Sequence, residues 1–264
     1  MQIKQRHERI LHLLEADGAV RNAQLAELFS VTNETVRKDL EALEQAECLM
    51  RVHGGATRVA DRRQGLPLPA REAQRRYEKA AVAQAAVGLI EPGDTVFFDA
   101  SSTVLSMASQ LPEIPITVLT NAHHVIVVLG ERPQCDLICT GGNYEERSRS
   151  YVGPIAEDAL RRFVIRRLFL GVDGLHPSVG ASEVNPGQAV LKERLIARAE
   201  HVCIVCDSSK LGRKSPFIFA RTSQIDVLVT DDRADEAAIR HYRAEGIEVI
   251  QAPLDEALES DRFT

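Results

Sequence analysis

Seven short apolar runs, most of them separated by helical patterns, limit the fold of the C-terminal part of the chain more than any other feature. Short apolar runs that alternate with helices form the strands of a mostly parallel sheet covered on both faces. We therefore predict an α/β domain. The runs are TVFFD (95–99), ITVLT (116–120), DLICT (136–140), RRLFLGV (166–172), HVCIVC (201–206), DVLVT (226–230) and IEVI (247–250).

The first 58 residues follow a different pattern, that of three short helices and a hairpin. Apolar residues recur at helical spacing over residues 3–16, 22–29 and 32–47. The sequence CLMRVHGGATRV (48–59) then alternates apolar and polar residues around a Gly-Gly turn. This order of elements predicts a winged helix-turn-helix domain over residues 1–58, with the helix-turn-helix at about 20–39.

Basic residues outnumber acidic ones between Arg58 and Lys79, around the sequence GLPLP. This composition predicts a basic, solvated linker over residues 59–78, and contact with DNA phosphates is the alternative function for it. The larger α/β domain then occupies residues 79–264.

Polar side chains at the start of the third predicted helix can contact DNA. Asn, Arg and Lys pair with base edges in the major groove, and Thr contacts phosphate or a thymine methyl. Residues 1–58 nevertheless hold eight Lys and Arg against nine Asp and Glu, so a protein-binding module stays an alternative. The predicted DNA-binding residues are Thr32, Asn33, Glu34, Thr35, Arg37, Lys38, Arg51, His53 and Arg58.

Two N-terminal motifs resemble those of a known family. Residues 35–40 read TVRKDL and residues 53–56 read HGGA, and both are similar to the recognition helix and wing of the DeoR family of bacterial sugar-operon repressors. The resemblance implies a repressor that binds double-stranded operator DNA as a homo-oligomer, a dimer or a tetramer. The family usually has glycine and an aliphatic residue where this chain has Glu47 and Cys48, so we expect a different turn into the wing.

Small or polar residues follow five of the predicted strands. At the carboxyl ends of parallel strands they would meet in one crevice, where hydroxyls and helix N–H groups bind anions. Ser and Thr also cap helices without any ligand, which is the alternative for residues 101–103. The predicted effector site consists of Asp99, Ser101, Ser102, Thr103, Thr120, Asn121, Gly141, Gly142, Asp173, Gly174, Lys192 and Lys210, with the two lysines as candidates for binding phosphate.

These strand ends also resemble the effector domain of the DeoR family, in which the segment D-S-S-K-x-G matches residues 207–212. That domain is similar in fold to ribose-5-phosphate isomerase. The resemblance implies a phosphorylated sugar or sugar alcohol as inducer, and the stretches DASSTVLSM and SSKLGRKSP look most like the glucitol (sorbitol) operon repressor branch. The family usually has glycine where this chain has Ser101.

A sugar-phosphate isomerase-like enzyme fused to a DNA-binding module is the alternative function. Isomerisation needs a carboxylate base above the sugar, and the isomerase pattern has further acids after its Asp-Gly. Here Asp173 and Gly174 are followed by LHP. Glu193 falls near the register of the isomerase's catalytic glutamate, but we interpret it as an exposed helix residue. We therefore predict a regulator without catalytic residues.

Composition limits the compartment and the cofactors. No apolar run approaches the roughly 20 residues of a membrane span, and the charged N-terminus is not a secretory signal, so we expect no membrane partner and a cytoplasmic protein. The net charge of −6 argues against a surface that binds nucleic acid everywhere. We interpret Cys203 and Cys206 as core residues of the apolar run VCIVC, and we expect neither a metal nor a cofactor.

Overall fold

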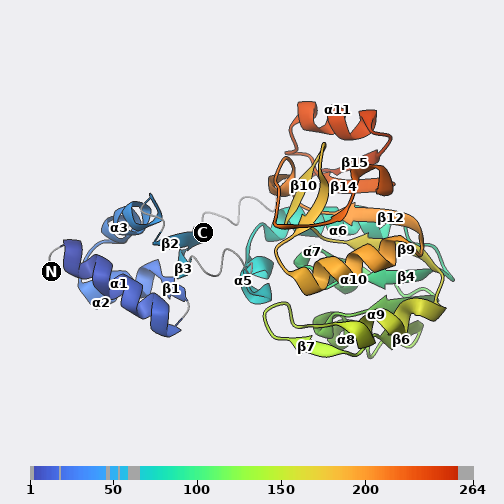
Figure 1. Ribbon diagram of the computed structural model, residues 1–264, viewed down its shortest axis with the longest axis horizontal. Coiled ribbons are helices and arrows are strands. Elements are labelled where there is room, and N and C mark those ends of the chain that lie inside the picture. Colours follow the sequence, from blue (N-terminus) through green and yellow to red (C-terminus); the bar gives the residue numbers. More distant parts are fainter. Residues whose placement is uncertain (1–2, 18, 46–47, 53, 59–65, 255–264) are drawn as a thin grey trace. The chain divides into compact units, whose positions relative to one another are not determined.

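The computed structural model describes residues 3–17, 19–45, 48–52, 54–58 and 66–254 (Figure 1). The chain forms two compact units, Met1–Leu66 and Pro67–Thr264. Among the described residues no helix is both long and apolar enough to cross a membrane.

The first unit is a winged helix-turn-helix, as the sequence predicts. Its three strands form an antiparallel sheet in the order β1-β3-β2. The sequence pattern indicated the β2–β3 hairpin but not β1, which has only three residues. The elements are α1 (Ile3–Asp17), β1 (Ala19–Arg21), α2 (Asn22–Phe29), α3 (Asn33–Gln45), β2 (Leu49–Val52) and β3 (Gly55–Arg58).

Two adjacent glycines allow the wing to form. Gly54 has a φ of +79°, a left-handed conformation that residues with a side chain rarely adopt. At Gly55 a Cβ atom would lie 1.9 Å from the carbonyl oxygen of Val20, so only glycine lets β3 approach β1 this closely. The Gly-Gly pair is therefore needed both for the turn and for the third strand.

A buried ion pair joins α1 to α3. The carboxylate of Asp39 accepts hydrogen bonds from Arg6 Nε at 2.7 Å and Arg6 Nη2 at 2.9 Å, and it lies 3.1 Å from His7 Nε2. Both Arg6 and Asp39 are buried. Burial alone would raise the pKa of Asp39, but the hydrogen bonds from Arg6 and His7 hold that pKa below its ordinary value. Asp39 of the TVRKDL motif therefore has a structural role on the face opposite the exposed one.

The second unit is built on a seven-stranded parallel sheet, as the sequence predicts. The strand order is β15-β14-β12-β9-β4-β5-β6. Each predicted apolar run overlaps one of these strands. They are β4 (Thr95–Phe98), β5 (Ile116–Thr120), β6 (Cys135–Cys139), β9 (Ile165–Leu170), β12 (Ala199–Val205), β14 (Val227–Asp231) and β15 (Glu248–Ala252).

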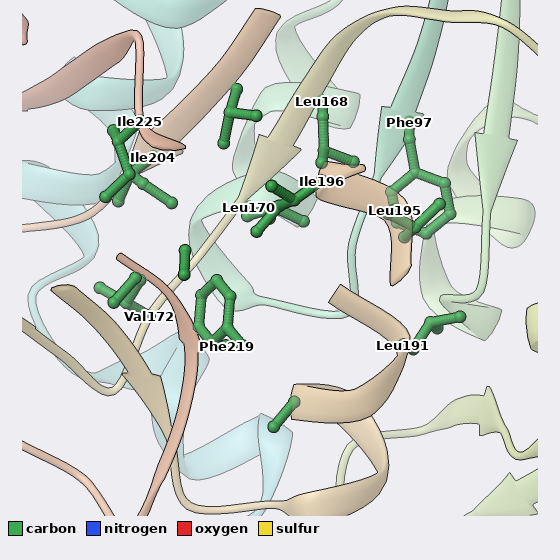
Figure 2. Close-up of a cluster of buried hydrophobic side chains, with 14 of the residues drawn as sticks. Phe97, Leu168, Leu170, Val172, Leu191, Leu195, Ile196, Ile204, Phe219 and Ile225 are labelled. Carbon is green, nitrogen blue, oxygen red and sulfur yellow. The ribbon is translucent and has the colours of Figure 1, made fainter. Parts of the chain in front are cut away.

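Helices cover both faces of this sheet, and each face has its own hydrophobic core. Successive strand residues alternate between the cores: Phe97 packs in one, which Figure 2 shows, whereas Val96 and Phe98 pack in the other. Residues of α6 (Arg76–Val87), α7 (Ser102–Gln110) and α8 (His123–Leu129) pack with Val96 and Phe98. Residues of α9 (Pro154–Ala159), α10 (Pro186–Ile196) and α11 (Glu236–Ala244) pack with Phe97.

Short elements at the strand ends complete the unit. A three-stranded antiparallel sheet has the order β10-β11-β13, and β7 pairs with β8 in a hairpin. The sequence pattern did not indicate these short strands. They are β7 (Asn143–Glu145), β8 (Ser150–Val152), β10 (Gly174–His176), β11 (Gly180–Glu183) and β13 (Phe217–Ala220).

The second unit begins inside the segment that the sequence assigns to a linker. Residues 59–65 lie outside the described residues, but residues 67–78 form α5 (Leu68–Ala73) and the beginning of α6. Leu68 is fully buried, and its N–H donates a hydrogen bond of 2.8 Å to the carbonyl oxygen of Arg147. This leucine fixes α5 to the second unit, which the basic composition did not indicate.

We expect Asp39→Ala to destabilise the first unit by about 3 kcal/mol, because it removes the carboxylate that compensates the buried Arg6 guanidinium. The tyrosines, Tyr77, Tyr144, Tyr151 and Tyr242, all belong to the second unit, and the chain has no tryptophan. In urea unfolding of Asp39→Ala, far-ultraviolet circular dichroism should therefore show a transition at a lower urea concentration than in the wild type. Tyrosine fluorescence should not detect this transition. Because the pKa of Asp39 is lowered on folding, its contribution should be present above the unfolded pKa of about 3.9 and be lost below it.

The exposed neighbour Arg37 provides the control. Arg37→Ala should change the free energy of unfolding by less than about 0.5 kcal/mol. Equal effects of the two substitutions would contradict a structural role for Asp39.

Candidate anion-binding site and nucleic-acid interface

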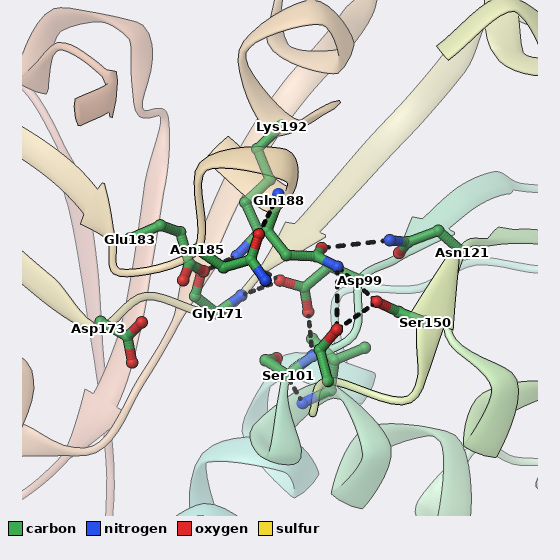
Figure 3. Close-up of polar contacts among 12 residues, drawn as sticks. Asp99, Ser101, Asn121, Ser150, Gly171, Asp173, Glu183, Asn185, Gln188 and Lys192 are labelled. Atoms are coloured by element: carbon green, nitrogen blue, oxygen red, sulfur yellow. Dashed lines mark hydrogen bonds and ion pairs between the residues drawn. The ribbon is translucent and has the colours of Figure 1, made fainter. Parts of the chain in front are cut away.

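The strand order of the parallel sheet reverses between β4 and β9, and ligands of open α/β sheets bind at such a point. Asp99 follows β4 and is buried there (Figure 3). Its carboxylate accepts the N–H groups of Ser101 and of Gly171, which follows β9, each at 3.0 Å. Asp99 thus fixes the loop that leads into α7, where the Ser101 hydroxyl caps the helix by accepting the N–H of Val104.

The structure accounts for Ser101 at a position where the DeoR family usually has glycine. Ser101 has a φ of −90°, which any residue can adopt, so the loop does not need glycine there. The glycine lies opposite instead: a Cβ atom on Gly171 would be 2.3 Å from the Ser101 Cβ. The serine is therefore accommodated because residue 171 has no side chain.

A buried lysine connects three strand ends behind this loop. The Lys192 ammonium, from α10, donates hydrogen bonds to the Gly171 carbonyl oxygen at 2.8 Å and to Glu183 at the end of β11, and it lies 2.8 Å from an Asp99 oxygen. Burial alone would lower the pKa of Lys192, but the carboxylates of Asp99 and Glu183 raise it above its ordinary value. Lys192 therefore stays charged, and its three acceptors are held around it (Figure 3).

Two interacting acidic side chains, Glu183 and Asp173, have pKa values that are shifted in opposite directions. Burial, with the nearby Asp173 charge, raises the pKa of Glu183 to about 8 despite Lys192. Burial would also raise the pKa of Asp173, but its interaction with Glu183 and the charges of Lys210 and Arg71 lower it to about 2. The pKa of Glu183 is therefore raised and that of Asp173 lowered, in opposite directions within one site.

In front of these residues lies a cavity of about 190 Å³. One water needs about 10–15 Å³, so the cavity has room for a larger ligand. Hydroxyl groups of Ser101, Ser102 and Thr103 line it where α7 begins. Cationic side chains outnumber acidic ones in its wall. The cations are Arg71, Arg75, Lys79, Lys210 and Arg213, and the acids are Asp173, Glu183 and Asp207.

The crowding of cations affects Lys79, which is buried. Burial lowers its pKa to about 8, with Lys210 and Arg71 contributing to the decrease and Asp207 and Glu78 opposing it. A cluster of cations at a helix N-terminus, with hydroxyl groups beside it, suits a phosphate group. The cavity can therefore bind an anion, and its hydroxyls and Asp173 can bind polar groups attached to that anion.

Some of the predicted effector residues line this cavity and others do not. Ser101, Ser102, Thr103, Asp173 and Lys210 line it. Asp99 and Lys192 do not line it but hold its wall from behind through the contacts described above. The remaining predicted residues, Thr120, Asn121, Gly141, Gly142 and Gly174, do not line it either.

These remaining residues make structural contacts. The Thr120 hydroxyl donates to the Phe98 carbonyl oxygen at 2.7 Å, and the Asn121 amide donates to the Tyr151 carbonyl oxygen at 3.0 Å. At the predicted glycines the backbone either passes too close to a neighbouring segment for a side chain or has a positive φ. A Cβ atom at Gly142 would lie 2.8 Å from the Val152 carbonyl oxygen, one at Gly174 would lie 2.7 Å from that of Arg213, and Gly141 has a φ of +61°.

Sequence reasoning missed several lining residues. Arg71 and Arg75 belong to the basic stretch 59–78 that we interpreted as linker, and Lys79 was predicted only as the first residue of the α/β domain. Glu183 gave no signal, because β11 is too short to recognise and the partner Lys192 lies on a different element. Gln74, Asp207, Ser209 and Arg213 also line the cavity, and the second and third of these belong to the DSSK motif.

Other sequence interpretations are settled by burial. Glu193 is exposed on α10 and does not line the cavity, as we expected of a surface residue. Cys203 and Cys206 are buried in the core, and burial raises the pKa of the Cys203 thiol to about 12. In the part of the chain that the structure describes, no three His, Cys, Asp or Glu residues gather as metal ligands would.

The predicted DNA-contacting residues gather at the start of α3. Thr32 caps this helix by accepting the Thr35 N–H at 3.1 Å. Thr32, Asn33, Glu34, Arg37 and Lys38 are exposed and Thr35 is half-buried, while Val36, Asp39, Leu40 and Leu43 face the core. Arg37 lies 3.9 Å from the exposed Glu34.

The wing residues are only partly described. Arg51 is exposed on β2, 3.9 Å from Glu44. His53 lies outside the described residues, and so does the side chain of Arg58, whose backbone belongs to β3. The turn that contains Glu47 also lies partly outside them.

Comparisons with known proteins match both units. Residues 6–62 match the model of the DeoR-like helix-turn-helix domain, and residues 74–232 match that of the DeoR C-terminal sensor domain. The uncharacterized HTH-type transcriptional regulator YulB of Bacillus subtilis is 34% identical over 96% of this chain and 98% of its own length. The putative aga operon transcriptional repressor of Escherichia coli O157:H7 is 33% identical over 93% of each chain.

A likeness to solved structures is more distant. Ribose 5-phosphate isomerase A from Methanocaldococcus jannaschii superposes with a TM-score of 0.40 and 15% identity, over 52% of this chain and 55% of that one. A likeness at this level carries no argument about chemistry. The matching family and these relatives are transcriptional regulators, so the comparisons do not support the isomerase alternative.

We expect Lys192→Met to destabilise the second unit by about 3 kcal/mol, because it leaves the Asp99 carboxylate buried without its counter-charge. Urea unfolding followed by tyrosine fluorescence measures this effect. Glu193→Gln, one position further along α10, is the control and should change the stability by less than about 0.5 kcal/mol. A Lys192→Met protein as stable as the control would show that the buried ion pair does not hold this wall.

Proposed function

The chain belongs to the DeoR family of transcriptional regulators, and we propose that it represses a sugar or sugar-alcohol operon and is released from operator DNA by a phosphorylated inducer. The observation that carries the proposal is the cationic, hydroxyl-lined cavity at the switch point of the sheet, on the same chain as a winged helix-turn-helix. Such a protein acts where its operator is, in the cytoplasm.

The cavity favours a sugar phosphate over a simple anion. Its cations and the start of α7 suit the phosphate, whereas Asp173 and the serine hydroxyls suit the hydroxyls of a sugar chain. Names of relatives are consistent with this ligand class: one is described as an aga operon repressor and another as the L-fucose operon activator. We propose a repressor rather than an activator, and a homo-oligomer, because the family resemblance implies both.

We propose that the cavity senses its ligand and does not convert it. The acids that an isomerase would use as a base are engaged here: Asp99 is paired with Lys192, and Glu183 contacts Lys192 and Asp173. Glu193 is exposed away from the cavity. Turnover of ribose 5-phosphate by the purified protein above background would overturn this part of the proposal.

Release of DNA requires the inducer to bind the two functional states with different affinities, since equal affinity would shift nothing. A thermal-shift screen against sugar and sugar-alcohol phosphates would find the inducer, because a ligand specific for the folded state raises the melting temperature. If no sugar phosphate raised it, the proposed effector site would be wrong.

Two substitutions should separate DNA binding from inducer binding. Arg37→Ala should weaken binding to a duplex selected by the protein from a random pool by roughly tenfold to a hundredfold, because a base-edge contact contributes about 1–3 kcal/mol. It should leave inducer binding unchanged. Lys210→Met should leave DNA binding unchanged and lower the affinity for the inducer by about tenfold or more, because a charge-assisted hydrogen bond is lost. Fluorescence anisotropy and isothermal calorimetry measure the two affinities.

These two variants are controls for each other. If Arg37→Ala bound the selected duplex as tightly as wild type, the reading role of α3 would be wrong. If Lys210→Met responded to the inducer at wild-type concentrations, the phosphate would have to lie elsewhere.

Affinity for a sugar phosphate should fall as the pH rises through about 8, because Lys79 loses its proton there. The ligand does not titrate in this range, since its second pKa is about 6. Lys79→Arg should give a shallower profile, because a guanidinium keeps its proton and, of the two lining groups at residues 79 and 183, only Glu183 then titrates near pH 8. Calorimetric titrations on both sides of pH 8 test this, and parallel profiles for the two proteins would exclude Lys79 from the site.

A further inference from the structure

Residues 68–79, which we call the strap, contribute part of the cavity wall from an unexpected place in the chain. They comprise α5 and the start of α6, and they supply Arg71, Gln74, Arg75 and Lys79 to the cavity. The first unit ends at Leu66, so the strap is almost the first segment after the winged helix-turn-helix. A ligand that contacts the strap therefore acts close in sequence to the DNA-binding unit.

Leu68 holds the strap to its own unit, and Lys79 closes the strap on itself. Leu68 is buried and its N–H donates to the Arg147 carbonyl oxygen at 2.8 Å. At the other end the Lys79 ammonium donates to the carbonyl oxygens of Arg71 and, at 2.7 Å, of Gln74. A cation therefore holds the C-terminal carbonyl groups of α5, on the wall of a cavity that already has an excess of positive charge.

The middle of the strap has an unfavourable backbone conformation and a buried nitrogen without a hydrogen-bond partner. Arg75 has a φ of +50°, a left-handed conformation that is unfavourable for a residue with a side chain. It lies 3.4 Å from Glu78 and 3.6 Å from Asp207, while its own side chain stays partly exposed. Among the described residues Arg71 Nε is buried without a hydrogen-bond partner, and so are both ring nitrogens of His124, which lies outside the strap on α8; each is destabilising. Burial and the nearby Arg71 charge lower the pKa of His124 to about 4.

The opposite wall of the cavity is different in this respect. Asp99 and Lys192 tie the loops that follow β4 and β9, whereas the cations Lys210 and Arg213 come from the segment that follows β12. An anion between the strap and this segment would contact cations of both. It would replace repulsion among like charges by attraction on both sides.

We propose that an anion in the cavity fastens the strap to the sensing unit, so that ligand binding orders the segment that follows the DNA-binding unit. The inference rests on the proposed function, because it places the anion in the same cavity as the inducer. The strap becomes more ordered when the anion binds, whereas the wall held by Lys192 does not change. Regulation then begins at Arg71 and Arg75.

Hydrogen exchange of the full-length protein tests the fastening, with inorganic phosphate as the probe and chloride at equal ionic strength as the reference. At about ten times its dissociation constant, phosphate should slow the exchange of amides in residues 68–79 by about tenfold. Amides of α11, whose residues do not line the cavity, should not change. The melting temperature, measured in the same buffers, reports whether phosphate binds at all.

The outcomes distinguish the two proposals. No rise in melting temperature with phosphate would overturn both the anion site and the fastening. A rise without protection of residues 68–79 would leave the anion site standing and overturn the fastening. Protection that extends equally to α11 would also overturn it, because the effect would then be a general stabilisation.

Two matched variants show whether the strap's own contact is responsible. Arg71→Gln and Arg213→Gln each remove one cation from the cavity, the first on the strap and the second on the opposite segment. At phosphate concentrations scaled to each variant's affinity, protection of residues 68–79 should persist in Arg213→Gln and fall to less than about twofold in Arg71→Gln. Equal protection in both would show that the strap does not contact the anion, and the proposal would be wrong.

Discussion

The sensing unit depends on the contacts that the buried, charged ammonium group of Lys192 makes with its acceptors. Burying it is costly unless acceptors compensate the charge, and its acceptors come from the ends of three different strands. Asp99 after β4, Gly171 after β9 and Glu183 at the end of β11 must therefore lie around one point. That requirement fixes the back wall of the cavity, sets the position of Ser101 and leads the chain into α7 where an anion can bind.

The first unit depends on a buried ion pair of the same kind. Asp39 and Arg6 join α1 to α3, and the residues beside Asp39 in the TVRKDL motif, Arg37 and Lys38, face solvent. One motif thus contains a residue that positions the helix and residues that can contact DNA. A short helix needs such tertiary anchoring, because its own hydrogen bonds stabilise it only marginally in water. The exposed face of α3 therefore keeps its orientation because Asp39 is paired with Arg6.

Much of the fold could be predicted from local patterns, because strands buried on both faces and amphipathic helices have distinct periodicities. The candidate site was harder to predict. Lys192 was predicted to bind phosphate, since its partner Glu183 lies on a short strand without a recognisable pattern. We interpreted Arg71 and Arg75 as linker residues, since the burial of Leu68 and the contact of Arg75 with Asp207 join segments that are distant in the sequence. In both cases the role of the residue depends on a contact with a segment that is distant in the sequence. Local sequence patterns do not reveal such contacts.

The two walls of the cavity differ in a way that bears on how a sensor works. A ligand changes an equilibrium only if it interacts differently with the two states. The Lys192 wall is satisfied before any ligand arrives, so contacts with it add affinity without distinguishing states. The strap wall has a left-handed arginine, a buried Arg71 nitrogen without a hydrogen-bond partner and an excess of positive charge. A bound anion would relieve more unfavourable interactions on that side, and we therefore place there the larger part of the differential free energy that regulation needs.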